Sequence, residues 1–422
     1  MDVLVIGGGL AGLSAAAALA GAGHRVRVLE SRPYPGGRAT SYESGGETID
    51  NCQHVLLRCC VNLLDFYKRL GVEAEISFSR EFYFIEPGGR RSVMRRSLGS
   101  FLSLKFLNLR EKFAIARALR AIPAEYARRG DLDGITMQQW LQEKGQPRRA
   151  VERFWRQVLV SAINEELDRM AARHGLQVFR LGLLAGPEAY EMGVPNVPLG
   201  QLYSSQSWQR LGGVQICLRS VAQAFHISGD KVQSVTTSGG KARADAYVLA
   251  VPFERVAALV PELNLDFSGF EHSPITGIHL WFDRPVTDLP HATFLDRTIQ
   301  WMFNKSEGRY VQLVISASRS LVEMPRAEVI ALAQRELAEF LPAAREARIE
   351  KAQVVKEVRA TFSAKPGLEA KRPATRTAIQ NLFLAGDWTR SGWPATMEGA
   401  VRSGYLAAEA IAGQKFLLPD VI

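Results

Sequence analysis

The chain has 422 residues, of which 47% are hydrophobic and 23% are charged, a globular composition long enough for two or three domains. Lysine and arginine (52) outnumber aspartate and glutamate (43), which gives a net charge of +9; the cations are spread along the chain, which argues against a dedicated nucleic-acid arm and leaves an anionic surface open as a partner. No run of about 18 consecutive apolar residues occurs, so no segment is expected to span a bilayer.

The chain begins with an apolar strand at residues 2–6 that runs directly into a glycine turn and an alanine-rich helix. In a GxGxxG turn, Gly7 allows the tight bend, Gly9 lets the backbone approach a pyrophosphate, and Gly12 lets the helix lie close to the strand. The alternative is a structural turn without a ligand. We predict a dinucleotide whose phosphates lie at the positive end of the helix. The predicted contacts are Gly7, Gly9, Leu10, Ala11 and Gly12.

Two features that follow favour the dinucleotide. A second apolar strand ends at Glu30, the position where a carboxylate grips ribose hydroxyls and disfavours a 2′-phosphate. Six residues later, Gly36, Gly37 and Arg38 add a second glycine pair with a cation, which a plain NAD site does not need but a longer flavin dinucleotide can use. We therefore predict FAD. The additional predicted contacts are Glu30, Ser31, Gly37 and Arg38.

Polar side chains crowd together at residues 50–54, between apolar runs and ahead of a helix predicted at 56–70. Such a cluster is typical of a functional site. For His54 alone, the alternative is a histidine hydrogen-bonded in the core.

The four cysteines, at positions 52, 59, 60 and 217, have no spacing suited to zinc, so no metal site is predicted. We expect no signal peptide, because the apolar strand begins at Asp2. A reducing, cytoplasmic compartment is therefore expected.

Short alternating runs between residues 76 and 91 predict strands of a second domain. Residues 95–120 then interleave apolar and cationic side chains. One interpretation is a basic, amphipathic segment that lies on a membrane surface. The other is a pair of ordinary helices with solvated cationic faces. The apolar members are Phe101, Leu102, Leu104, Phe106, Leu107 and Leu109.

The remaining elements are predicted from hydrophobic period and from turn residues. Helices are predicted at residues 137–145, 151–175, 214–224 and 326–340, and strands at 231–235, 244–251, 275–282 and 310–316. Near the C-terminus, an apolar strand from residue 381 stops at Asp387, and a helix begins near residues 395–397. Two nucleotide-type segments therefore bracket the chain.

These pieces together resemble the FAD-dependent amine oxidase and phytoene desaturase superfamily: GGGLAG, Glu30, GGR at 36–38, and LAGDW followed by ATMEGAVRSG. The resemblance implies an α/β fold, with a Rossmann-like FAD-binding domain assembled from residues 1–75, 200–260 and 370–422. An α+β substrate and membrane-facing domain, residues 76–199 and 261–369, is inserted into it.

The resemblance also implies further cofactor contacts. Gly386 and Asp387 would approach the ribityl or phosphate part of FAD, and Val232 would hold the adenine. The helix that begins near Ala395, Thr396 and Met397 would point its amides at the pyrimidine edge of the flavin, where negative charge gathers on reduction.

Within the superfamily, DNCQHVLL at 50–57, SPIT at 273–276, LWFDRPV at 280–286 and GDWT at 386–389 resemble hydroxysqualene dehydroxylase, also called squalene-associated FAD-dependent desaturase. One departure is Cys52, where the family pattern has glycine. The strand at 275–279 lacks the lysine that amine oxidases often carry there, and no cysteine lies in the C-terminal flavin segment. Noncovalent FAD is therefore expected.

The resemblance implies an enzyme that reductively removes the allylic hydroxyl of hydroxysqualene to give squalene, in hopanoid or isoprenoid biosynthesis. His54 would protonate the departing hydroxyl, with Gln53 and Asn51 orienting it. Asn164 is a further catalytic candidate, from the SAIN segment. Alternatives are a carotenoid-type desaturase, a flavin amine oxidase, or a non-enzymatic flavin-binding redox sensor or isoprenoid carrier.

The expected partners follow from this substrate. They are a C30 isoprenoid, the inner face of the cytoplasmic membrane as a peripheral docking surface, an upstream hydroxysqualene synthase and a downstream cyclase. No nucleic acid is expected.

Overall fold

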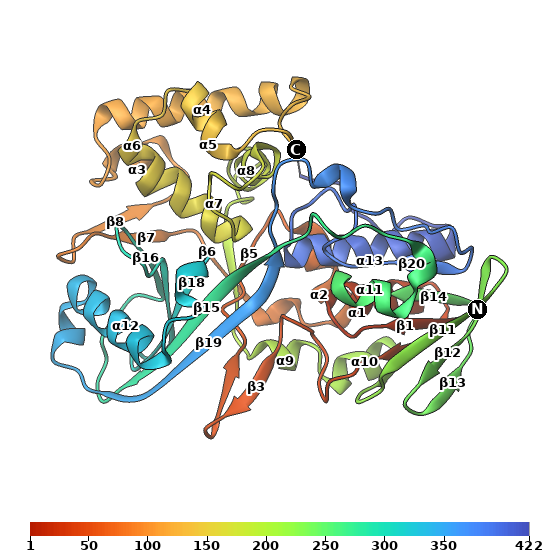
Figure 1. Cartoon of the computed structure of the whole chain (residues 1–422). Coiled ribbons are helices and arrows are strands. Elements are labelled where there is room, and N and C mark those ends of the chain that lie inside the picture. Colours follow the sequence, from red (N-terminus) through yellow and green to blue (C-terminus); the bar gives the residue numbers. More distant parts are fainter. Residues whose placement is uncertain (422) are drawn as a thin grey trace. The chain divides into compact units, whose positions relative to one another are not determined.

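The computed structural model describes residues 1–421, which form two compact units (Figure 1). Unit 1 consists of Met1–Ser77, Gly193–Phe270 and Leu368–Val421, and unit 2 of Phe78–Met192 and Glu271–Gly367. Unit 1 is thus assembled from three chain segments. Its middle segment is longer than the 200–260 that the sequence predicts.

A parallel sheet in the order β10-β2-β1-β14-β20 is the framework of unit 1. Its strands are β1 (Asp2–Ile6), β2 (Arg25–Leu29), β10 (Val214–Cys217), β14 (Ala246–Leu249) and β20 (Leu382–Leu384). β1 pairs with β2 on one side and with β14 on the other, so the next strand of the chain and a much later one extend the sheet from β1 in opposite directions. The strand order therefore reverses beside β1. Ligands of parallel sheets bind at the carboxyl ends of the strands, at this kind of reversal. The glycine turn that follows β1 lies there.

Two helices that begin at glycine-rich segments pack closely in unit 1, α1 (Leu10–Gly21) and α13 (Met397–Ala412) (Figure 1). A Cβ atom added at Gly404 would lie 2.2 Å from the Ala11 carbonyl oxygen. The Ser14 hydroxyl, also on α1, is hydrogen-bonded at 3.3 Å to the Val401 carbonyl of α13. Gly404 on α13 therefore lets the two helices approach closely.

The other elements of unit 1 are shorter. Its helices are α2 (Val61–Leu70), α9 (Leu199–Leu202), α10 (Ser205–Leu211) and α11 (Phe253–Leu259). Its remaining strands are β3 (Ser41–Ser44), β4 (Glu47–Asp50), β5 (Leu56–Leu57), and the antiparallel set β11 (Ala222–Ser228), β12 (Lys231–Thr237) and β13 (Gly240–Ala242). Two of the four crossings of the chain between the units lie in β6 (Ile76–Ser79) and β9 (Met192–Pro195), and the other two lie after Phe270 and after Gly367.

Unit 2 contains a seven-stranded sheet in the order β19-β15-β18-β17-β16-β7-β8, with one parallel pair, β16 and β7. The strands are β7 (Phe82–Ile85), β8 (Arg91–Met94), β15 (His272–Phe282), β16 (His291–Phe294), β17 (Trp301–Ser306), β18 (Tyr310–Ser316) and β19 (Ile349–Phe362). One face packs on α12 (Arg326–Phe340), where the rings of Phe294 and Phe340 stack with centroids 4.2 Å apart. Figure 1 shows α12 beside this sheet.

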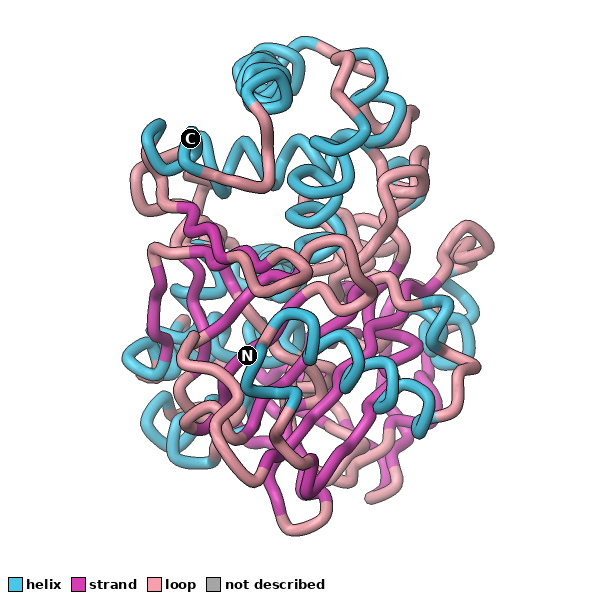
Figure 2. The backbone as a smooth tube through the Cα atoms, turned by 90° about the vertical axis from the view of Figure 1, so that its left-hand side faces the viewer, coloured by secondary structure: helices cyan, strands magenta, loops and turns pink. Residues whose placement is uncertain are grey.

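A group of helices completes unit 2: α3 (Leu98–Ser103), α4 (Leu109–Arg128), α5 (Met137–Glu143), α6 (Arg148–Ala150), α7 (Arg156–Ile163) and α8 (Ala172–Phe179). α4 appears end-on at the top of Figure 2. It begins with a capping box, in which Asn108 and Glu111 each satisfy a backbone N–H of the other.

Several predicted elements are confirmed, among them the strands at 275–282 and 310–316 and the helix at 326–340. One helix prediction is wrong, and two predicted helices are present with other bounds. Residues 214–217 form β10 because they pair in parallel with β2. The helix predicted from residue 56 begins at Val61, after the short strand β5. The helix predicted over 151–175 is interrupted at Asn164, which takes a left-handed conformation at φ 59°.

Candidate active site

The glycine turn after β1 has the geometry of a dinucleotide cradle. Gly7 has φ 112°, and a Cβ atom there would lie 2.3 Å from the Ala250 carbonyl oxygen. A Cβ at Gly12 would lie 1.9 Å from the Gly7 carbonyl oxygen. The close packing of the backbone, without any ligand, therefore requires glycine at both positions. Gly9 differs, because a Cβ there would meet only the Gly37 Cα, at 3.9 Å. The space beside Gly9 fits a pyrophosphate.

The second glycine pair lies against the first. The Gly36 N–H donates to the Gly8 carbonyl at 2.8 Å, and Gly9 forms a parallel bridge with Gly36. Within the described residues, no side chain caps the N-terminus of α1 beside them. The positive end of that helix is therefore available to an anion.

Glu30 is buried at the end of β2, and its carboxylate accepts hydrogen bonds from the backbone N–H of Gly8 at 2.8 Å and of Arg32 at 2.7 Å. The neighbouring Ser31 hydroxyl donates to the same carboxylate at 3.2 Å. Glu30 thus holds the glycine turn. The predicted role of Glu30 and Ser31 in binding ribose stays a prediction.

The two sequence segments most typical of a flavin site meet in an ion pair. Arg38 of the GGR segment lies 2.7 Å from Asp387 of the GD pair, measured from Nη2 to Oδ2. Asp387 is almost fully buried, whereas Arg38 is partly exposed. Gly386, at φ 149°, donates its N–H to the Ser403 hydroxyl at 2.8 Å and so ties this segment to α13. Residues from both ends of the chain therefore form one site.

Sequence reasoning missed Arg372, which organises the loop after β20. This side chain is 1% exposed and donates to the carbonyl oxygens of Asp387 at 2.8 Å and Trp393 at 2.7 Å, and to that of Thr389. Burial lowers its pKa, while the ion pair with Glu369 acts to raise it. No periodicity marks an isolated arginine of this kind, so its role emerges only from the fold.

The N-terminus of α13 is capped by Thr396, whose hydroxyl accepts from the Gly399 N–H at 3.0 Å. Ala395 is buried, and Met397 is the first residue of the helix. The next residue, Glu398, is fully buried, and its carboxylate accepts from the backbone N–H groups of Asn62 and Leu63 at 3.3 and 2.7 Å. It thereby caps α2 from another helix. Burial raises the pKa of Glu398, while these bonds act to lower it.

The turn at residues 50–54 is hydrogen-bonded to the cradle. The Asn51 side-chain amide donates to the Arg38 carbonyl at 3.1 Å, and Arg38 in turn pairs with Asp387. The Asp50 carboxylate accepts from the Ser41 hydroxyl at 2.7 Å and from the Leu199 N–H at 3.0 Å. Asp50 and Asn51 therefore fix the position of the turn, and the predicted catalytic role of Asn51 stays a prediction.

His54 and Gln53 form the tip of the same turn, and both are partly buried. His54 Nδ1 lies 2.8 Å from the Cys52 carbonyl oxygen, which fits a proton on Nδ1 and an imidazole that gains and loses its second proton at Nε2. The Gln53 amide donates to the His54 carbonyl at 3.3 Å. The backbone at position 52 thus orients the imidazole, whichever side chain stands there.

Two of the predicted site residues, Val232 and Asn164, make hydrogen bonds that stabilise the fold of their own units. Val232 is buried in β12, and its backbone N–H and carbonyl both bond to the Asn381 side chain, at 2.8 and 3.0 Å; its predicted contact with adenine stays a prediction. Asn164, in unit 2, donates to the Ser273 carbonyl and the Thr361 hydroxyl, both at 2.9 Å, and accepts from the Ala317 N–H at 2.7 Å. Both amide N–H groups and the amide oxygen thus have partners within unit 2, and the predicted catalytic role of Asn164 stays a prediction.

The face of the unit 2 sheet opposite α12 carries a polar and aromatic row. By strand register, His279, Gln312, Phe303 and His291 lie side by side on β15, β18, β17 and β16. Among the described residues, neither amide atom of the fully buried Gln312 has a hydrogen-bond partner. An unsatisfied buried amide is costly, which is typical of a surface kept for a purpose other than stability.

Within residues 1–421, no group of three or more histidine, cysteine or acidic side chains could hold a metal ion. In the same part of the chain, no helix is long and apolar enough to cross a membrane.

Comparison with known proteins identifies the class. The family model described as flavin containing amine oxidoreductase matches residues 10–412. The chain belongs to this family, and its cofactor is FAD. An oxidoreductase from Methanosarcina mazei has the same fold, with a TM-score of 0.75 at 19% identity, covering 98% of this chain and all of that one.

Full-length relatives are of two kinds. The chain is 31% identical to a hydroxysqualene dehydroxylase of Rhodopseudomonas palustris, over 97% of this chain and 98% of that one. It is 28% identical to a hydroxysqualene dehydroxylase of Zymomonas mobilis subsp. mobilis, over 96% and 97%. A 15-cis-phytoene desaturase of Synechococcus elongatus is 26% identical, over 98% and 96%.

Proposed function

We propose that this FAD-dependent oxidoreductase removes the allylic hydroxyl of hydroxysqualene reductively and releases squalene. The observation that carries the proposal is the full-length similarity to hydroxysqualene dehydroxylases. The polar turn at residues 50–54 supports it, because the turn is bonded through Asn51 to the arginine that pairs with Asp387.

The reaction replaces a carbon–oxygen bond by a carbon–hydrogen bond. When bound, reduced FAD supplies the electron pair and the hydrogen. The protein must protonate the hydroxyl as it departs as water, because hydroxide is a poor leaving group. In the proposal His54 does this from Nε2, with its ring held by the bond between Nδ1 and the Cys52 carbonyl. Gln53, bonded to the His54 backbone, limits the motion of the turn.

A desaturase is the second candidate, because the phytoene desaturase similarity also spans nearly the whole chain. It would run the electron flow in the opposite direction, from substrate to FAD, and needs no acid for a leaving hydroxyl. An amine oxidase is less well supported, because β15 has no lysine between Ile275 and His279.

Anaerobic flavin spectroscopy separates these functions. Photoreduced holoenzyme mixed with hydroxysqualene should regain the oxidised flavin spectrum, with squalene as product. Bleaching of the oxidised enzyme by phytoene or by a primary amine, with no response to hydroxysqualene, would instead identify a desaturase or an oxidase. No response to any of the three would favour a redox sensor or carrier.

The substrate and product are too apolar to cross water as free molecules. In the proposal the protein is cytoplasmic, docks peripherally on the inner face of the membrane, takes hydroxysqualene from the enzyme that makes it and passes squalene to a cyclase. Fractionation of cells that express the tagged chain tests this: recovery in the salt-washed soluble fraction alone would contradict it.

A further inference from the structure

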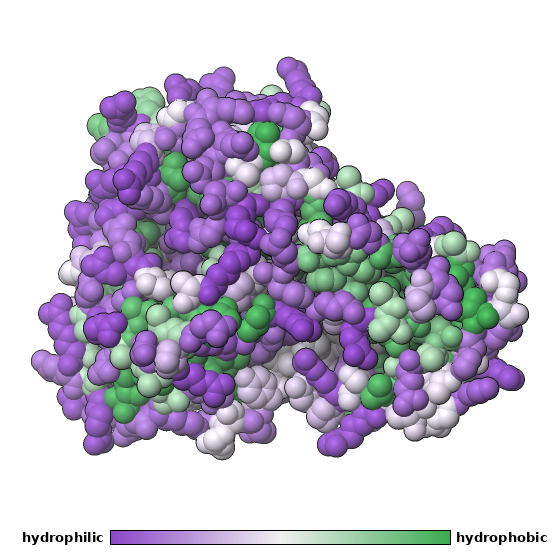
Figure 3. Space-filling view, viewed as in Figure 1, coloured by the Kyte–Doolittle hydropathy of each residue, from purple (hydrophilic) through white to green (hydrophobic). Residues whose placement is uncertain are grey.

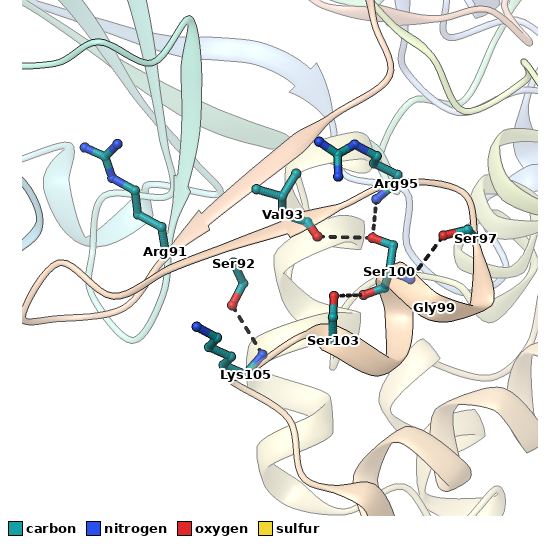
Figure 4. A pocket seen from close by; sticks show the side chains of 9 residues that line it. All are labelled: Arg91, Ser92, Val93, Arg95, Ser97, Gly99, Ser100, Ser103 and Lys105. Atoms are coloured by element: carbon teal, nitrogen blue, oxygen red, sulfur yellow. Dashed lines mark hydrogen bonds between the residues drawn. The ribbon is translucent and has the colours of Figure 1, made fainter.

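The pocket in unit 2 formed by β8, α3 and the start of the loop to α4 is lined by cations and hydroxyls (Figure 4). Its volume is about 410 Å³. Arg91, Arg95 and Lys105 contribute the charge, and Ser100 lies on the α3 wall. The Ser100 hydroxyl donates to the Val93 carbonyl at 3.1 Å and accepts from the Arg95 N–H at 2.7 Å. Strand, loop and helix are thereby fixed around the cavity.

The cations of the pocket are only weakly neutralised. Arg91 lies 3.1 Å from Asp288, which is 75% exposed, and Arg95 pairs with Glu81. The exposed pair of Arg91 is worth little and exchanges readily for another anion, whereas the carboxylate of Glu81 is partly buried. Among residues 1–421, no acidic side chain pairs with Lys105, which is exposed at the rim. The pocket therefore offers an anion a cationic site.

Apolar side chains protrude beside this pocket. Leu98 and Leu102 lie one helical turn apart on α3 and are 74% and 48% exposed, and Leu109 and Phe113 lie one turn apart on α4 and are 68% and 77% exposed. On α3 the leucine pair is adjacent to the face with Ser100 that lines the pocket. Green atoms interrupt the hydrophilic outline where α4 begins in Figure 3.

The relative placement of α3 and α4 is fixed. Lys112, in the first turn of α4, is buried, and its ammonium donates to the carbonyl of Leu102, in the last turn of α3, at 2.6 Å. This hydrogen bond joins the end of α3 to the start of α4. Of the apolar residues that the sequence interleaves with cations, Leu104, Phe106 and Leu107 are buried in unit 2. The exposed apolar set is therefore a smaller group presented on two ordered helices, and the membrane-surface interpretation of the sequence stays a prediction.

The exposed charge that residues 91–120 contribute to this surface has one sign. Every exposed charged residue between positions 91 and 120 is a lysine or arginine, and the single carboxylate in that range, Glu111, is buried in the capping box. Clustered cations beside protruding apolar side chains fit the boundary of an anionic bilayer, where the charge meets phosphates and the apolar groups enter the acyl region.

We infer that the surface formed by this pocket with Leu98, Leu102, Leu109 and Phe113 docks on an anionic phospholipid bilayer, with one lipid headgroup phosphate in the pocket. The phosphate accepts from Arg91, Arg95 and Lys105, and the four apolar side chains enter the lipid. An acidic protein or a nucleic acid would not account for four exposed aliphatic and aromatic side chains beside the charge.

Sedimentation with vesicles tests the pocket, without any isoprenoid present, so the result is independent of the proposed reaction. The holoenzyme should bind phosphatidylcholine vesicles that contain phosphatidylglycerol far better than pure phosphatidylcholine vesicles. R91Q/K105Q should bind the anionic vesicles about thirtyfold more weakly, because each cation contributes about fivefold near such a surface. The matched control is K231Q/K241Q, which removes the same charge from exposed positions on β12 and β13 of unit 1 and should bind as the wild type does.

The apolar side chains are tested with L98Q/F113Q, which should weaken binding at least about tenfold to vesicles of the same anionic composition. The six positions changed in the three double variants are exposed, so each variant should keep its melting temperature and FAD. Equal losses of vesicle binding in R91Q/K105Q and K231Q/K241Q would overturn the pocket as the binding site, because the net charge of the protein would then explain the binding. Absence of wild-type binding, or equally tight binding of polyglutamate or duplex DNA with the same dependence on R91Q/K105Q, would overturn the bilayer as occupant.

Discussion

Replacing Glu398 by glutamine should destabilise unit 1 while leaving its apolar packing unchanged. The carboxylate accepts from the Asn62 N–H at 3.3 Å, the Asn62 side-chain amide at 2.8 Å and the Leu63 N–H at 2.7 Å. A glutamine has one acceptor oxygen, and its NH₂ group would face a donor. At least one buried N–H loses its acceptor, which costs about 1–3 kcal/mol.

That cost should be visible as a lower melting temperature. A domain of roughly 150–250 residues loses about 2–4 °C for each kcal/mol, so E398Q should melt about 2–12 °C below the wild type. Circular dichroism and flavin fluorescence on the same heated sample report the loss of helix and the release of FAD.

The control is E328Q, the same substitution in the first turn of α12, where the side chain is exposed. It should change the melting temperature by much less, because an exposed first-turn carboxylate contributes only about 0.3–1 kcal/mol. Equal melting temperatures for E398Q and E328Q would refute the assignment of Glu398 as the cap of α2.

Four further outcomes are expected. His54→Ala should retain FAD and slow the reoxidation of the reduced enzyme by hydroxysqualene about 10²–10⁴-fold, whereas His226→Ala, at an exposed position of unit 1, should leave it unchanged; equal rates in the two variants would return His54 to a structural role. Gly9→Val should fold, because a Cβ atom there would meet only the Gly37 Cα, at 3.9 Å. It should purify without FAD, because the side chain would occupy the space of the pyrophosphate; a yellow variant with full occupancy would contradict the cradle. Gln312→Leu should raise the free energy of unfolding by about 1–3 kcal/mol, because it removes an unsatisfied buried amide; a loss of stability would show that the amide is satisfied in solution. Burial lowers the pKa of His291 below its unfolded value of 6.5, so the stability that the neutral imidazole contributes is present above that pH and is lost on acidification. His291→Gln should therefore lose less stability than the wild type between about pH 7 and pH 5. Parallel profiles of stability against pH would exclude His291 as a source of the acid sensitivity.

Local patterns were enough to predict the cradle. The spacing of Gly7, Gly9 and Gly12 marks one strand–turn–helix unit, and the close contact of Gly12 with the Gly7 carbonyl lies within that unit. The contact of Gly7 with the Ala250 carbonyl does not, and no local pattern predicts it. The family resemblance places the segments of Arg38 and Asp387 at one flavin, and the ion pair between them emerges only from the fold.

Non-local contacts limited the remaining predictions. Residues 214–217 read as a helix start after two glycines, and only pairing with β2 makes them a strand. The bonds of Asn164 reach Ser273, Thr361 and Ala317, which no local pattern brings together. The role of Glu398 likewise depends on α2, which lies over three hundred positions earlier in the chain.

The most direct test of the proposed function is a single turnover under anaerobic conditions. Holoenzyme reduced to completion is mixed with excess hydroxysqualene in vesicles, and the oxidised flavin formed and the squalene produced are counted in the same sample. The proposal predicts one squalene for each FAD oxidised, with no squalene from the oxidised enzyme. Flavin that stays reduced while hydroxysqualene is recovered unchanged would contradict it.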